Sequence, residues 1–151
     1  MSLTEEPEIV TWPETHYLFI ERIGAFSQTA QPCWQELHRA LPAIAEKNRV
    51  TGHLSLYKMR PDTYRAGVSL AAPPAEIPEG LQYTKFPGGK YSRFVWTGSY
   101  SKLPEVSGRV WHLVEEKQIP QRDDFTIEHY PNDPKTTPEE QLITEILIPT
   151  A

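Results

Sequence analysis

The feature that most constrains the fold of this chain is a local pattern that occurs twice, 74 residues apart. Residues 23–27 read Ile-Gly-Ala-Phe-Ser, and residues 97–101 read Thr-Gly-Ser-Tyr-Ser. At an offset of 73, Leu54-x-x-Tyr57 also aligns with Ile127-x-x-Tyr130. Element order and register agree between the halves, so an internal duplication explains the pattern better than chance. Each unit then has to cover an open sheet with its own helix.

The first repeat reads as strand, helix, strand, strand. β-forming residues fill 16–23 and stop at Gly24, as in a strand that ends in a turn. Residues 26–47 place apolar side chains at helical spacing, and Pro42 within them predicts a kink or an early end of the helix. Residues 52–59 and 64–71 then form a hairpin across Arg60-Pro61-Asp62-Thr63, which is favourable turn chemistry.

The second repeat has the same order. Strands are expected over 81–86 and 90–97, a helix after Ser101, and a closing hairpin over 125–149. We therefore expect one α+β domain over 1–151, built from a duplicated strand-helix-strand-strand unit with pseudo-two-fold symmetry and a central ligand cleft. Repeat one spans about 15–72, a Pro-rich connector about 73–80, and repeat two about 81–149. Residues 1–14 show little periodicity and are interpreted as an arm.

Composition narrows the classes of partner. The chain has 151 residues and a formal net charge of −5, and no Lys/Arg cluster of the kind that binds nucleic acid or anionic membranes. Its apolar runs are far shorter than the roughly 20 residues that span a bilayer. We expect a soluble, cytoplasmic protein. Cys33 is the only cysteine and the five histidines lack metal-binding spacing, so neither a metal nor a cofactor is expected.

The closing hairpin carries two carboxylates among apolar neighbours. Side-chain alternation puts Glu128 with Thr126 and Tyr130, and it puts Glu145 on the opposite side of its strand from Thr144 and Ile146. Either acid could look into a cavity, and either could equally lie on a solvated face. The first repeat has Ser55 where the second has Glu128, which predicts a cleft whose negative charge comes from the C-terminal half.

Several segments in order resemble the GyrI-like small-molecule-binding domains. They are LQYTKFPGGKYSRFVWTGSYSKL, TYRAGVSL and IEHYPNDPKTTPEEQLITEILIP, and the resemblance covers residues 15–149. This family includes the effector-binding domains of AraC-type and MerR-type regulators as well as stand-alone proteins. The resemblance implies a cleft for apolar, often cationic aromatic compounds, with an acid ringed by aromatic side chains. The residues that match the family's acid and aromatic positions are Glu128 or Glu145, Tyr100, Trp111, Tyr130 and Tyr57.

Three functions remain open at this point. The leading hypothesis is a stand-alone effector-binding or multidrug-binding module, because only about 15 residues precede the first strand and no DNA-binding helices fit there. The resemblance also allows a hydrolase of strained electrophilic ring compounds, in which Glu128 or Glu145 is the general base for a water molecule. A third reading is an interaction or inhibitor protein. Carboxylates that bind a cation and carboxylates that activate water look alike in sequence.

Overall fold

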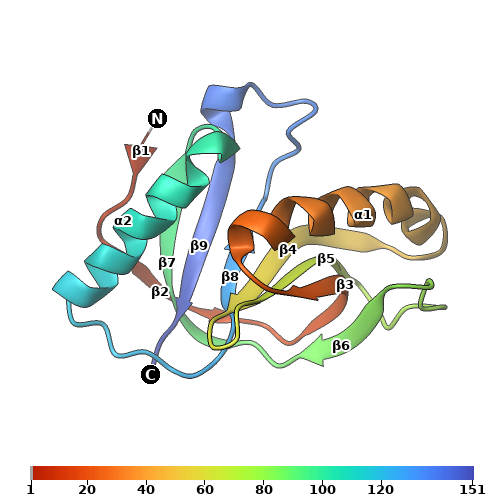
Figure 1. Ribbon diagram of the computed structural model, residues 1–151, viewed down its shortest axis with the longest axis horizontal. Coiled ribbons are helices and arrows are strands. Elements are labelled where there is room, and N and C mark those ends of the chain that lie inside the picture. Colours follow the sequence, from red (N-terminus) through yellow and green to blue (C-terminus); the bar gives the residue numbers. More distant parts are fainter. Residues whose placement is uncertain (1) are drawn as a thin grey trace. The chain divides into compact units, whose positions relative to one another are not determined.

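The computed structural model describes residues 2–151. The chain divides into two compact units: Pro13–Gly88 forms one, and the segments up to Trp12 and from Gly89 to Ala151 form the other. The elements in chain order are β1 (Ser2–Leu3), β2 (Glu8–Trp12), β3 (Thr15–Ile23), α1 (Phe26–Lys47), β4 (Val50–Lys58), β5 (Thr63–Leu70), β6 (Gln82–Phe86), β7 (Gly89–Thr97), η1 (Tyr100–Lys102), α2 (Leu103–Glu116), β8 (Thr126–His129), η2 (Glu139–Gln141) and β9 (Ile143–Pro149) (Figure 1).

In the unit Pro13–Gly88, four antiparallel strands in the order β4-β5-β3-β6 carry α1 on one face (Figure 1). Alternate residues of the strands, such as Leu18 and Val68, meet Leu37 and Ile44 of the helix in one buried cluster. The apolar stripe that predicted an amphipathic helix is therefore the surface that buries this sheet.

Helix α1 does not end or break at Pro42. It runs without interruption from Phe26 to Lys47 with both Pro32 and Pro42 inside it, so the expectation of an early end is wrong. Each proline removes one backbone donor. Leu37 and Ile44, which flank Pro42, are fully or almost fully buried against the sheet. Packing on both sides of the proline offsets the lost hydrogen bond.

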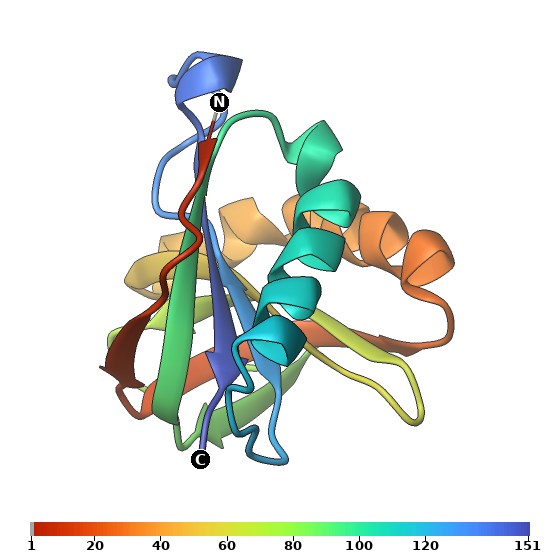
Figure 2. The ribbon, with the colours of Figure 1, turned by 90° about the vertical axis from the view of Figure 1, so that its left-hand side faces the viewer.

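In the other unit, β7 is the central strand of an antiparallel sheet. β9 pairs with one edge of β7 and is followed by β8, whereas β2 and β1 pair with successive stretches of its other edge. Figure 2 shows the N-terminal segment running along β7, with α2 lying across the sheet. The core of this unit joins Phe94 and Ile146 of the strands to Val110 and Leu113 of α2.

The two repeats exchange their first strands. β2 and β6 are related by the same offset of 74 residues as β3 and β7. Yet β2 pairs with β7, and β6 pairs with β3, in matching registers: Glu8 lies opposite Arg93, as Gln82 lies opposite Phe19. Residues 1–14, expected as an arm, thus contain two strands. Residues 82–86, which the sequence placed in repeat two, lie in the unit built mainly from repeat one.

The α+β class and the duplicated order of elements are confirmed. Strands β3 and β7 begin and end 74 residues apart, and each is followed by a helix and then by two antiparallel strands. The ligand cleft expected at the centre of the duplicated fold stays a prediction.

Candidate functional site

Glu128 lies on the face of β8 that is turned to α2. Its carboxylate accepts a hydrogen bond from the Tyr130 hydroxyl at 2.8 Å, and Ser107 of α2 supplies a second hydrogen bond. Thr126 shares this face of the strand, because alternate side chains of a strand point the same way. The acid is therefore held by a helix and by its own strand, rather than projecting freely into water.

Burial is the main influence on this acid. It raises the pKa of the Glu128 carboxyl above its ordinary value, while the hydrogen bonds from Tyr130 and Ser107 offset part of that rise. A carboxylate in such a place has lost much of its hydration. A cation that approached it would restore the missing charge partner.

Tyr100, at the start of the short helix η1, contacts the Tyr130 ring that adjoins Glu128. The Ser99 hydroxyl accepts a hydrogen bond from the Ser101 backbone and thereby caps the first turn. The Tyr100 ring meets the Tyr130 ring edge to face, with centroids 5.6 Å apart and planes at 63°. Its hydroxyl is buried without a hydrogen-bond partner among residues 2–151. Burial, together with nearby Asp133, raises the pKa of the Tyr100 phenol.

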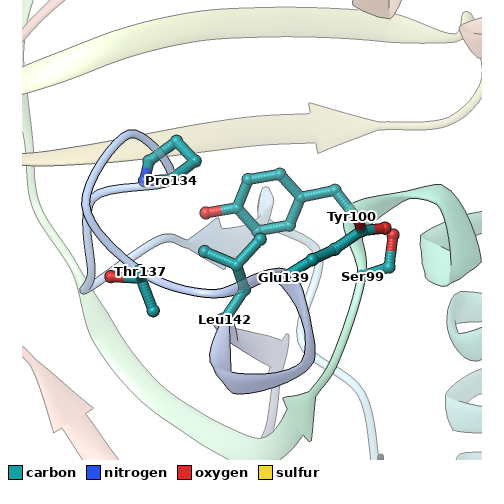
Figure 3. Close-up of a pocket in the computed structure, with 6 residues that line it drawn as sticks. All are labelled: Ser99, Tyr100, Pro134, Thr137, Glu139 and Leu142. Atoms are coloured by element: carbon teal, nitrogen blue, oxygen red, sulfur yellow. The ribbon is translucent and has the colours of Figure 1, made fainter.

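An open groove of about 310 Å³ begins at the same tyrosine. Figure 3 shows the Tyr100 ring between Pro134 and Leu142, with its hydroxyl directed to the loop that carries Pro134. The groove is lined by Ser99, Tyr100, Pro134, Thr137, Glu139 and Leu142. Tyr100 thus lines the groove and contacts Tyr130, the residue that donates to Glu128.

Glu145 lies on the opposite face of the sheet from α2. Its carboxylate accepts a hydrogen bond from His129 at 2.7 Å and pairs with Arg93 at 3.0 Å. Arg93 also pairs with Glu8 at 2.7 Å, and the Trp12 ring meets His129 edge on at 5.3 Å. The hydrogen bond from His129 lowers the pKa of Glu145, and the charge of Arg93 acts in the same direction against the effect of burial. This acid is already paired with a cationic side chain, Arg93.

The predicted site residues thus fall into separate groups. Glu128, Tyr130 and Tyr100 come together, whereas Glu145 belongs to the network with Arg93 and His129. Trp111 packs against the core beneath α2. Tyr57 is buried in the other unit, where its ring stacks on Tyr64 at 6.4 Å. A role for each of them in binding stays a prediction.

Ser107 is a site residue that the sequence did not single out. It lies 73 residues after Trp34, the offset that also relates Tyr57 to Tyr130, so the duplication could have indicated it. A serine on a helix carries no signal of its own, because serines are common on solvated helix faces.

Two further observations concern other kinds of site. Among residues 2–151, no three His, Cys, Asp or Glu side chains are grouped so as to hold a metal ion. Within the same range, neither helix has the length and apolar character needed to cross a membrane.

Comparison with protein families identifies the class. Residues 5–151 match the family described as the GyrI-like small molecule binding domain. The chain belongs to this family, which confirms the resemblance seen in the sequence. It is a small-molecule-binding domain.

Solved structures share the fold. SAV2435, solved bound to tetraphenylphosphonium, is 18% identical with a TM-score of 0.78, covering 97% of this chain and 94% of that one. The EcmrR C-terminal domain is 14% identical with a TM-score of 0.78, covering 100% and 99%. A hydrolase from Listeria innocua is 14% identical with a TM-score of 0.61, covering 98% and 93%. No curated protein is similar enough in sequence to match this chain.

Proposed function

We propose that this protein binds cationic aromatic compounds at the cluster formed by Tyr100, Ser107, Glu128 and Tyr130. The observation that carries the proposal is Glu128, an acid whose burial raises its pKa and which lies against an aromatic pair. Two neutral hydroxyl groups donate to it. No cationic side chain of residues 2–151 forms an ion pair with it within 4.0 Å, in contrast to Glu145.

A lipophilic cation suits this arrangement for two reasons. A cation on an aromatic face gains about 0.5–2 kcal/mol, and its charge interacts with a carboxylate through a medium less screening than water. The adjoining groove at Tyr100 and Leu142 offers apolar surface for the remainder of such a compound. The structure of SAV2435 with tetraphenylphosphonium makes that cation a suitable probe.

The test is a titration of tetraphenylphosphonium by calorimetry into the wild-type protein, Glu128→Gln and Glu145→Gln. We expect Glu128→Gln to weaken binding of the cation by about 5- to 100-fold, the equivalent of about 1–3 kcal/mol. Triphenylphosphine oxide, a neutral compound with similar rings, should bind both proteins alike. Equal cation affinity for wild type and Glu128→Gln would contradict the proposal.

Hydrolysis is the second candidate, favoured by the same raised pKa, which suits a general base. The fold shared with a Listeria innocua hydrolase also supports this hypothesis. In this scheme Glu128 takes a proton from water, the resulting hydroxide opens an epoxide carbon–oxygen bond, and the proton ends on the alkoxide to give a diol. Incubation with styrene oxide measures it: Glu128-dependent diol formation favours the hydrolase, and its absence favours the binding module.

A further inference from the structure

The two units contain corresponding aromatic frames. In one, Phe26 and Tyr57 meet at 5.4 Å with planes at 64°. In the other, Tyr100 and Tyr130 meet at 5.6 Å and 63°. Phe26 and Tyr100 are 74 residues apart, and Tyr57 and Tyr130 are 73 apart. The duplication has kept the geometry of this pair in both units, so the groups around it can be compared position by position.

Beside each aromatic pair, a strand residue with a polar side chain forms a hydrogen bond with a residue of the helix. In the first unit, the indole N–H of Trp34 donates to the Ser55 hydroxyl at 3.1 Å and to the Tyr64 hydroxyl at 2.9 Å. The buried Cys33 and Leu37 of α1 correspond at an offset of 73 to the buried Val106 and Val110 of α2. At this offset Ser107 takes the place of Trp34, and Glu128 takes that of Ser55. Ser107 hydrogen-bonds Glu128, just as Trp34 hydrogen-bonds Ser55.

At a third position, too, the second unit has a small side chain where the first has an aromatic one. Tyr64 lies opposite Tyr57 across the β4–β5 pair. The β8–β9 register sets Glu128 opposite Ile146, as β4–β5 sets Ser55 opposite Ala66, so Thr144 occupies the place of Tyr64. The Thr144 hydroxyl is buried and has no hydrogen-bond partner among residues 2–151.

These replacements leave the acid less covered than Ser55 is in the first unit. Ser55 is completely buried beneath Trp34 and Tyr64. Glu128 is partly exposed, because a serine and a threonine stand where the first unit has an indole and a phenol. In the first unit, the aromatic N–H donor to this strand position is the protein's own Trp34 side chain. In the second unit, the acceptor Glu128 has a serine hydroxyl in place of that indole.

We infer that the ligand of Glu128 is a planar cation of about the size of indole with an N–H group, occupying in this unit the place that the Trp34 side chain occupies in the other. Its N–H donates to the Glu128 carboxylate, and Thr144 offers a further hydroxyl. This inference rests on the proposed function and specifies its ligand. A charge-assisted N–H···O hydrogen bond is stronger than a neutral one, and an acceptor built to receive it discriminates against cations without a donor.

The experiment compares two bicyclic cations of similar size by calorimetry at pH 6. Protonated 2-aminobenzimidazole carries N–H donors, and 1-methylquinolinium has none. We expect the first to bind the wild-type protein at least about tenfold more tightly. Glu128→Gln should weaken both compounds and reduce the ratio between them.

A variant that fills the site gives an independent readout. Ser107→Trp introduces in this unit the side chain that the other unit already has, and we expect it to abolish binding of both cations. Glu115→Trp adds the same side chain at an exposed position of α2 and should bind as wild type does. Thermal unfolding checks that both variants fold. If Ser107→Trp does not fold, the ratio of the two cation affinities in the wild-type protein still tests the inference.

The outcomes separate the two proposals. If both cations bind equally and both depend on Glu128, the inference about the ligand is overturned while the proposed function holds. If neither bicyclic cation binds while tetraphenylphosphonium still binds through Glu128, only the inference about the ligand is overturned. If tetraphenylphosphonium binding also does not depend on Glu128, both proposals are overturned. Undiminished binding of 2-aminobenzimidazole by a folded Ser107→Trp variant would also overturn the inference.

Discussion

Replacing Glu145 by Gln should destabilise the protein without impairing cation binding. Glu145 is 17% exposed and receives charged or polarised N–H groups from Arg93 at 3.0 Å and from His129 at 2.7 Å. A pair of charges at this separation attracts by about 5 kcal/mol at an effective dielectric constant of 20. Desolvation cancels much of this attraction, and fully exposed pairs retain only about 0.2–1 kcal/mol.

The loss is larger here because one hydrogen-bond partner is left unsatisfied. Gln keeps one acceptor oxygen and turns an NH₂ group to the other donor. Hydrogen bonds to charged groups contribute about 1.5–3 kcal/mol, so we expect the free energy of unfolding to fall by about 2 kcal/mol. The corresponding change in Tm is about 4–8 °C.

Urea unfolding followed by circular dichroism at pH 7 measures this loss. Glu8→Gln is the matched control, since Glu8 binds the same arginine but is 64% exposed, and it should cost less than about 0.5 kcal/mol. Because the pKa of Glu145 is lowered, the stability it contributes is present above the ordinary carboxyl value and is lost as pH falls through the lowered pKa. Equal stability of the two variants, or loss of cation binding in Glu145→Gln, would refute this reasoning.

Three further predictions follow from the site and the fold. Because the pKa of Glu128 is raised, affinity for tetraphenylphosphonium should increase as pH rises through that pKa. Calorimetry between pH 4 and 8 would detect this dependence, and Glu128→Gln should abolish it. The stability of the free protein should decrease over the same range. Tyr130→Phe removes the hydroxyl that stabilises the charged carboxylate, so it should raise the pKa of Glu128 further and shift that profile to higher pH; an unshifted profile would contradict the role of the hydroxyl. Gly67→Ala should destabilise the protein by about 1–3 kcal/mol or more in urea unfolding, because the added Cβ would lie 2.6 Å from the Tyr17 ring and from the Leu18 carbonyl oxygen; unchanged stability would show that the strand yields there.

The elements of the fold could be predicted because local signals agreed with one another. Gly24 and Gly98 both end a strand before a helix, and both have positive φ. Glycine adopts this conformation readily, which makes it a dependable marker of such turns. Pro42 was misleading because its cost to α1 is offset by tertiary packing that a local pattern does not contain.

The exchange of β2 and β6 could not be predicted from sequence. Both strands have ordinary β-forming residues, and nothing in them specifies which edge of which sheet they join. For a similar reason, the sequence could not show that Glu128 and Glu145 lie on opposite faces of the sheet. Alternation fixes the neighbours of Glu128 and of Glu145 along each strand, but the face that meets α2 becomes known only with the register of β8 on β9.

Exchange of the first strands also determines how the chain can be divided. A cut in the connector at residues 73–80 would leave each half with strands whose partners are on the other half: β2 without β7 in the first half, and β6 without β3 in the second. Each fragment alone would present an unpaired edge, which is prone to self-association. When mixed, the two fragments should associate by fragment complementation, so the exchange makes the two copies of an ancestral repeat mutually dependent for completing their sheets.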